Sequence, residues 1–355
     1  MRLVHHDSAD RTGPARAHYL GESLAKEVRG ALASYAAHYR QLGIPPEVVR
    51  EVADGSRAAV EAWAPELVEE MDALAAGAGV PAREVMALNA RTEVLATHAP
   101  RDECSTVVRE ARDDAPAVAF QTWDWPAALA PVGVVWRYRT DAGRRVETFA
   151  EPGMLAKLGI NDAGLALAFN ILGHRSDTGR AGVPVHMVAR RVLDRAASLA
   201  DAVELASGVG VSASSALTVV AADGAASLEL APAGLGVVRP TGGWLVHTNH
   251  FLDARLAPGG RPRPGSTSAA RHDSLSRAVR GPVDTSSLAT TSACLCGPAG
   301  ELSPVCMWPD ETLPEHERMQ TLLTVRMVPG RGEFECVPGM PLETARSPVP
   351  ACAPR

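Results

Sequence analysis

The sequence predicts a layered α+β protein, and three observations lead to that fold class. The first hundred residues show apolar side chains at helical spacing. After Pro100 the pattern changes to short strand-like runs. Beyond that point, antiparallel hairpins alternate with two long helical segments. Hairpins whose outer faces are covered by helices favour an α+β sandwich over a parallel βαβ sheet.

The N-terminal quarter is expected to be helical. Apolar spacing predicts one helix over residues 21–42. Pro45 and Pro46 begin a second helix, and a long helix follows it and ends at the GAGVP segment, residues 77–81. A last helix is predicted from about Ala82 to about Leu95.

The rest of the chain is expected to form hairpins, strands and two further helices. Strands are predicted over residues 105–110, 117–125, 132–140 and 145–150. Hairpins are predicted over 158–171, 216–230 and 321–337, with two more strands leading to His247. The helices are expected over 184–207, broken near Ser198, and over 266–279. The Pro/Gly-rich segment 256–265 indicates a surface loop.

Composition narrows the class of protein. The chain has 355 residues, 46% of them hydrophobic, which is enough for a large core. The formal net charge is -6 with no dominant basic segment, so we expect no nucleic-acid partner. The start of the chain lacks a signal-peptide pattern and no apolar run is long enough to span a bilayer, so we expect a cytoplasmic protein without a membrane partner. Cys294 and Cys296 are expected to be structural thiols, and no spacing predicts a metal site.

Cys104 lies where the helical pattern gives way to the first strand. If the following turn is centred near Asp113 and Asp114, residue 104 lies opposite residue 123. The strand that holds Thr122 and Asp124 then runs beside Cys104, which would place a hydroxyl and a carboxylate near a thiol. A lone cysteine at the start of a strand is usually an inert buried thiol. Spacing alone therefore leaves both interpretations open.

A series of motifs runs in order along the chain from about Pro65 to Pro341. These motifs are LNARTE at 88–93, RDECSTVV at 101–108, QTWDW at 121–125, GINDAGLALAFN at 159–170, GVPVHMVARRVLDRA at 182–196, HTNHF at 247–251, SAARHDSL at 268–275 and TLLTVRMVPGRGEFECVPGMP at 321–341. Taken together and in this order, they resemble the isopenicillin N acyltransferase family of self-processing acyltransferases and amidohydrolases.

The resemblance implies a four-layer αββα sandwich of the N-terminal nucleophile hydrolase type, preceded by a helical segment. The chain would cut itself between Glu103 and Cys104 into a helical small chain, 1–103, and a catalytic chain, 104–355, which stay together. Cys104 would then be the nucleophile, and its free α-amine the base. Asn249 would donate its side-chain amide to the oxyanion, and Asp124 would orient the amine or the substrate.

Other positions are weaker candidates. Thr122 occupies a nearby pocket position by resemblance. Arg91 either braces the cleavage loop or lies on a solvated helix face, and Arg190 and Arg191 form either a helix surface or a contact to a substrate carboxylate. His250 is more often a hydrogen-bond partner than a ligand. The family often has glycine before the nucleophile, so Glu103 either slows cleavage or helps to move protons during it.

The expected substrates are small amides or acyl thioesters, broken or formed through an S-acyl-Cys104 intermediate without a cofactor or metal. Related alternatives are hydrolases of bile-salt-like, acyl-homoserine-lactone or β-alanyl amides. An alternative of another class is an unprocessed, non-catalytic protein that binds an acyl or peptidyl ligand. The sequence does not decide whether the reaction is hydrolysis or acyl transfer. It also leaves the oligomeric state open, and a homo-oligomer is possible.

Overall fold

The N-terminal part of the chain folds mainly into helices. The computed structural model describes residues 1–96, 104–112, 115–263 and 265–346. Its first helices are α1 (Pro14–Ser23), α2 (Ala25–Gln41), α3 (Pro46–Trp63), α4 (Pro65–Ala78), α5 (Ala82–Asn89) and α6 (Arg91–Ala96). The predicted helices over 21–42 and 82–95 are each divided, at Leu24 and at Ala90.

Proline and glycine set several helix ends, among them the predicted start at Pro46 and the predicted end in the GAGVP segment. Pro46 and Pro65 each occupy the first helical position of their helix, where the missing N–H leaves no hydrogen bond unmade. Gly79 ends α4 in the left-handed conformation at φ 65°. Helices α1 and α4 pack closely because Gly21 lies against the Leu74 carbonyl, where a Cβ would not fit.

An eight-stranded sheet forms one of the two central layers. Its strands are β1 (Arg2–Asp7), β4 (Val132–Arg139), β5 (Arg145–Ala150), β6 (Leu158–Asn161), β7 (Leu165–Ile171), β8 (Ser215–Ala221), β9 (Gly224–Ala231) and β10 (Gly234–Val238), in this spatial order. All neighbours are antiparallel except β1 and β4. The N-terminal quarter was predicted to be helical. This prediction is wrong for its first residues, which form the edge strand of this sheet.

A five-stranded sheet forms the other central layer. Its order is β11 (Trp244–His247), β2 (Cys104–Arg109), β3 (Val118–Pro126), β12 (Met319–Val328) and β13 (Glu333–Pro338). In the β2–β3 ladder, Cys104 pairs with Trp123, which is the register that the sequence predicted. The centre of the intervening turn, residues 113–114, lies outside the described residues.

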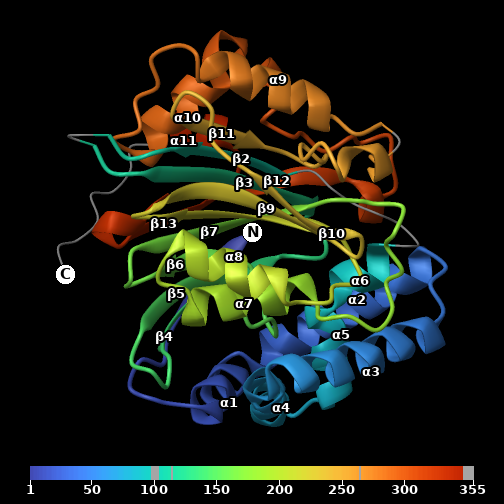
Figure 1. Cartoon of the computed structure of the whole chain (residues 1–355). Helices are drawn as coiled ribbons and strands as arrows, with labels where there is room; N and C mark the ends of the chain where they lie inside the picture. The colour runs from blue at the N-terminus through green and yellow to red at the C-terminus, as the bar shows by residue number, and fades with distance from the viewer. Residues whose placement is uncertain (97–103, 113–114, 264, 347–355) are drawn as a thin grey trace.

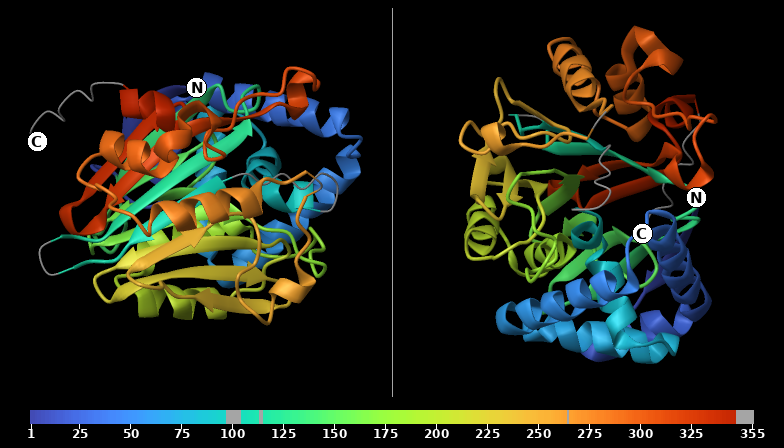
Figure 2. Two further views of the ribbon diagram at one scale, coloured as in Figure 1. Left: turned by 90° about the horizontal axis from the view of Figure 1, so that it is seen from above. Right: turned by 90° about the vertical axis from the view of Figure 1, so that its right-hand side faces the viewer.

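The two sheets pack face to face, with helices on both outer faces. Helices α7 (Val185–Arg195) and α8 (Leu199–Ser207) cover the eight-stranded sheet, as Figure 1 shows. Helices α9 (Ser268–Ala278), α10 (Leu288–Cys296) and α11 (Pro341–Arg346) lie beyond the five-stranded sheet (Figures 1 and 2). The predicted αββα sandwich is thus confirmed. Helices α10 and α11 were not predicted.

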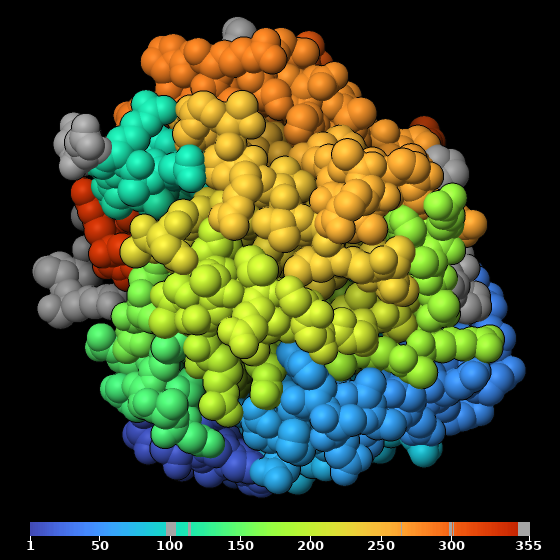
Figure 3. All heavy atoms as spheres, in the orientation of Figure 1, coloured from blue at the N-terminus to red at the C-terminus, as the bar shows by residue number. Residues whose placement is uncertain are grey.

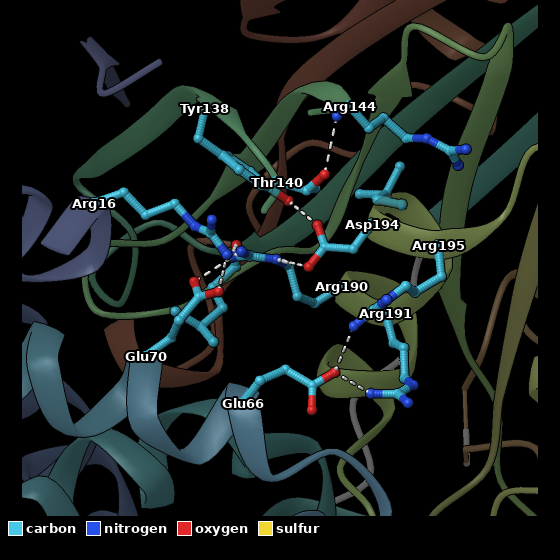
Figure 4. A network of polar contacts seen from close by, with 12 residues as sticks. Arg16, Glu66, Glu70, Tyr138, Thr140, Arg144, Arg190, Arg191, Asp194 and Arg195 are labelled. Atoms are coloured by element: carbon cyan, nitrogen blue, oxygen red, sulfur yellow. Dashed lines mark hydrogen bonds and ion pairs between the residues drawn. The ribbon is translucent and has the colours of Figure 1, made fainter. Parts of the chain in front are cut away.

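A buried ionic network joins the N-terminal helices to the sandwich. Glu70 on α4 accepts from Arg16 on α1 and, at 2.8 Å, from Arg190 on α7 (Figure 4). Arg190 also bonds to Asp194 at 2.8 Å, and Asp194 accepts from the Tyr138 hydroxyl at 2.6 Å. The helix-surface position predicted for Arg190 is therefore wrong, because its side chain is fully buried.

The same interface continues toward solvent. Arg191 and Arg195 on α7 both contact Glu66 on α4. In the space-filling view, the blue N-terminal helices lie directly against the yellow-green segment that carries α7 and α8 (Figure 3). The N-terminal segment is thus joined to the rest of the chain by apolar packing, ion pairs and the β1–β4 ladder. None of the helices in the described ranges is both long and apolar enough to cross a bilayer.

Candidate active site

Cys104 is the first residue of β2 and its side chain is buried between the two sheets. The side chain is 2% exposed and belongs to the main apolar core. Burial, and to a smaller extent the nearby charge of Asp124, raise the pKa of the thiol to about 12. A hydrogen bond from the Asp124 main chain acts in the opposite direction. In this form of the chain the thiol holds its proton at neutral pH.

Three side chains from distant segments hold the main chain of Cys104. Its N–H donates to Oδ1 of Asn249 at 2.8 Å. Its carbonyl accepts from Nδ2 of Asn170 at 3.0 Å and from the guanidinium of Arg271 at 2.7 Å. All three side chains are buried. These side chains therefore hold both the N–H and the carbonyl of Cys104, and the β2–β3 ladder holds the same strand.

Each of the three side chains is itself held in place. Asn249 follows β11, and its Nδ2 donates to the Ile171 carbonyl at 2.9 Å. Arg271 on α9 also donates to Oδ1 of Asn249 at 2.9 Å, so the two neighbours of Cys104 contact each other. Asn170 on β7 accepts from the Thr106 hydroxyl at 2.7 Å across the two sheets. Asn249 therefore acts here as an acceptor toward Cys104, while its donor group is occupied by Ile171.

Side chains alternate along β3, and this alternation separates the predicted neighbours of Cys104. Directly paired residues of an antiparallel ladder share a face, so Trp123 lies on the side of the thiol. Its ring packs edge-on against Phe149 of the other sheet at 5.4 Å. Thr122 and Asp124 are consequently directed to the opposite, helix-covered face. The strand thus lies beside Cys104 as predicted, and alternation directs the Thr122 hydroxyl to the face away from the thiol.

The other predicted positions are distributed around this centre. His250 lies beside Asn249, and its Nδ1 is 2.8 Å from the Ser268 hydroxyl. Ser268 also accepts from the main-chain N–H of Asn249 at 2.7 Å, so His250 belongs to the polar surroundings of that asparagine. Glu103, on the other side of the predicted cleavage bond, lies outside the described residues.

Arg91 is fully buried, so the solvated helix face considered for it is wrong. Its guanidinium bonds to Oε1 of Glu151 at 2.7 Å and lies 4.4 Å from the Trp125 ring centroid. The same carboxylate oxygen accepts from Lys157 at 2.8 Å, and Oε2 accepts from the Tyr35 hydroxyl at 2.6 Å. Burial opposes ionisation of Glu151, but Arg91 and then Lys157 hold its pKa at about 2.

Asn170, Arg271 and Lys157 belong to this centre but were not predicted as site residues. Asn170 resembled a turn asparagine, since it ends a predicted hairpin strand, and Arg271 lay within the SAARHDSL motif. Lys157 is one of only two lysines in the chain, and it sits in an apolar stretch before β6. An isolated lysine in such a stretch is the signal that indicates a buried cation. In the described part of the chain, no group of three or more His, Cys, Asp or Glu side chains could hold a metal ion.

Comparisons with known proteins agree with the predicted resemblance. Residues 118–289 match the family model described as acyl-coenzyme A:6-aminopenicillanic acid acyl-transferase. The acyl-coenzyme A:6-aminopenicillanic-acid-acyltransferase 40 kDa form of Emericella nidulans is 30% identical over 190 residues, which are 53% of this chain and 52% of that protein. The match thus spans about half the length of this relative. The resemblance to this acyltransferase family is confirmed over these residues.

Two solved structures are also similar to the chain. Penicillin V acylase from Agrobacterium tumefaciens aligns with a TM-score of 0.38 and 14% identity, over 66% of this chain and 83% of that one. A mutant of the conjugated bile acid hydrolase from Clostridium perfringens aligns with a TM-score of 0.40 and 12% identity, over 66% of this chain and 92% of that one.

Proposed function

We propose that this chain is a self-cleaving, N-terminal cysteine amidohydrolase or acyltransferase that carries its acyl group on Sγ of Cys104. One observation supports this proposal above the others. Asn249, Asn170 and Arg271 converge from three distant segments on the main chain of Cys104. An inert core thiol needs no such support, whereas a nucleophile must be held within a fraction of an ångström of its productive position.

Cleavage between Glu103 and Cys104 would convert the main-chain nitrogen of Cys104 into an α-amine. An α-amine titrates near pH 8, so it can take the proton of the adjacent thiol. Oδ1 of Asn249 already accepts from that nitrogen at 2.8 Å and would orient the amine. We therefore assign this orienting role to Asn249 in place of the predicted oxyanion contact, because Nδ2 is occupied by the Ile171 carbonyl.

The reaction would proceed through an S-acyl-Cys104 intermediate formed from a small amide or an acyl thioester. Water as the second reactant gives hydrolysis, and an amine gives acyl transfer. The match to an acyltransferase family favours substrates whose carbonyl carries a nitrogen or sulfur leaving group. Asp124 lies on the helix-covered face beside Cys104. Its negative charge already raises the pKa of the thiol and would also act on the nucleophile of the cleaved chain.

The two products of cleavage, residues 1–103 and 104–355, would remain associated. Strand β1 of the first product pairs with β4 of the second over six residues. Glu70 of the first product bonds to Arg190 of the second within the buried network (Figure 4). Neither contact involves the bond that breaks.

Intact-mass measurement of the purified protein tests the proposal. We expect two chains divided at the bond between Glu103 and Cys104, and a single chain of 37.2 kDa for Cys104→Ala. A wild-type chain that stays at full mass after long incubation would support the non-catalytic, ligand-binding alternative. A panel of N-acyl amines and acyl thioesters, with water or an added amine as acceptor, would then separate hydrolysis from transfer.

A further inference from the structure

The self-cleavage step lacks the base that serves the mature enzyme. Before cleavage, the nitrogen of Cys104 belongs to a peptide bond and donates its hydrogen to Asn249. An amide nitrogen does not take up a proton at neutral pH. The thiol of Cys104 is buried and its pKa is raised to about 12, so it does not ionise by itself. Another group must therefore accept the thiol proton during the first step.

Lys157 lies over the aromatic ring of the residue that pairs with Cys104. Its Nζ is 3.3 Å from the centroid of Trp123, which is paired directly with Cys104 across the β2–β3 ladder. The Cβ atoms of such a pair are about 4.5 to 5.5 Å apart on one face of the sheet. Lys157 and Cys104 are close enough that the charge of each acts on the pKa of the other.

The charges around Lys157 leave one removable proton. The cations Arg91 and Lys157 share one carboxylate, that of Glu151, and all three side chains are buried. Tyr35 donates its hydroxyl to the same carboxylate and adds no charge. Arginine does not release its proton in proteins, so of the two cations on this carboxylate only Lys157 can become neutral.

The pKa of Lys157 is consistent with two cations sharing one carboxylate. Burial lowers the pKa of Lys157 to about 7 against the opposing effect of the Glu151 carboxylate, and the positive charge of Arg91 contributes to this lowering. An appreciable share of the chains therefore holds a neutral amine at this position at neutral pH.

We propose that Lys157 accepts the thiol proton of Cys104 during self-cleavage and returns it to the leaving nitrogen. The inference rests on the proposed self-cleavage. The S–H proton moves to Nζ, and the thiolate forms a C–S bond to the carbonyl carbon of Glu103. The C–N bond to Cys104 then breaks, and the ammonium of Lys157 protonates the nitrogen, which becomes the α-amine. Water hydrolyses the thioester and restores the thiol.

Two substitutions of Lys157 separate a proton acceptor from a fixed charge. Lys157→Met removes the amine, keeps an unbranched side chain and leaves Arg91 paired with Glu151, so the core keeps a balanced ion pair. Lys157→Arg keeps the positive charge but cannot release its proton. The other lysine of the chain, Lys26, is exposed on α2, and Lys26→Met is the matched control.

Cleavage is followed by intact mass after cell-free synthesis of the full chain, with samples stopped at intervals between pH 6 and pH 9. We expect wild-type cleavage to accelerate as the pH rises through about 7. Both Lys157 variants should be slower by roughly 10²-fold or more and should lose this pH dependence, because a positioned base contributes about that factor. Lys26→Met should behave as wild type. Cleavage of Lys157→Arg at the wild-type rate would overturn the proposal.

A second measurement observes the lysine directly in the uncut Cys104→Ala chain. Lysine labelled with ¹³C at Cε gives two signals, because the chain contains two lysines, and Lys26→Met assigns them. The Lys157 signal should titrate at or below about pH 7. An ammonium that persists to pH 9 would contradict the proposal. If wild type is never cut, the proposed function fails; if it is cut equally fast without Lys157, only this inference fails.

Discussion

The main-chain nitrogen of Cys104 lies 2.8 Å from Oδ1 of Asn249, although 145 positions separate the two residues in the chain. This contact links the first residue of β2 to the residues that follow β11, its neighbour in the sheet. The hydrogen bond holds the nitrogen that becomes the α-amine in the proposed enzyme. The relationship therefore exists before the cleavage that would make it functional.

Replacing Asn249 should remove activity more than stability. Asn249→Ala leaves the Cys104 nitrogen without its acceptor, and we expect turnover to fall by about 10²-fold, the usual effect of misplacing a reacting group by about 1 Å. Steady-state rates on an amide or thioester that the wild type turns over, together with circular dichroism, would measure this. Asn161→Ala is the control, since that buried asparagine donates to the carbonyls of Leu193 and Ala196, far from the thiol. Near-normal turnover of Asn249→Ala would remove the orienting role.

Arg271 should be sensitive to the loss of its planar fork. It contacts both the Cys104 carbonyl and Oδ1 of Asn249, which a single ammonium cannot reach in the same geometry. We expect Arg271→Lys to lower turnover by about tenfold or more while the protein still folds. The matched control is Arg277→Lys, an exposed position on the same helix. Equal rates for the two variants would show that charge alone is required of Arg271.

Breaking the buried network at Glu70 should weaken the joint between the N-terminal helices and the sandwich. Glu70→Gln leaves Arg16 and Arg190 without their shared carboxylate, and loss of one partner of a buried pair costs about 3 to 5 kcal/mol. Urea unfolding in the uncut Cys104→Ala background gives the free energy of unfolding. Asp54→Asn, which breaks the exposed pair with Arg83, should cost about 0 to 1 kcal/mol. A loss as small for Glu70→Gln would argue against the network as the joint.

Glu93 should make stability depend on pH in one direction. Burial raises the pKa of Glu93 to about 7, while Oε1 accepts from the Val185 N–H at 2.8 Å. The folded state therefore binds a proton that the unfolded state releases above about pH 4.3. The resulting stabilisation is complete below that pH and is lost as the pH rises through about 7.

The neutral variant Glu93→Gln should lack this loss, so its stability relative to wild type should increase between pH 5 and about pH 8. Thermal or urea unfolding across that range, again in the uncut background, would follow the difference. Glu84→Gln, at an exposed position on α5, provides the comparison. A difference between Glu93→Gln and wild type that stays constant with pH would contradict the assignment.

Local patterns in the sequence determined most of the secondary structure and one important register. Hairpins, proline starts and the Gly79 end of α4 depend on neighbouring residues, so they could be predicted without the fold. The pairing of Cys104 with Trp123 followed from the length of one hairpin. The position of the candidate nucleophile, and its resemblance to an acyltransferase family, were also available from the sequence.

The tertiary structure alone decided which side chains surround the thiol. Strand β1 pairs with β4 across more than a hundred residues, and no local pattern indicates that contact. Likewise, Arg91 and Lys157 are charged residues whose burial depends on Glu151, a partner that only folding brings to them. A strand predicted at the right register still presents alternate residues to opposite faces. The choice of face, which puts Trp123 beside Cys104 and turns Thr122 away, depends on which side of the sheet meets the second sheet.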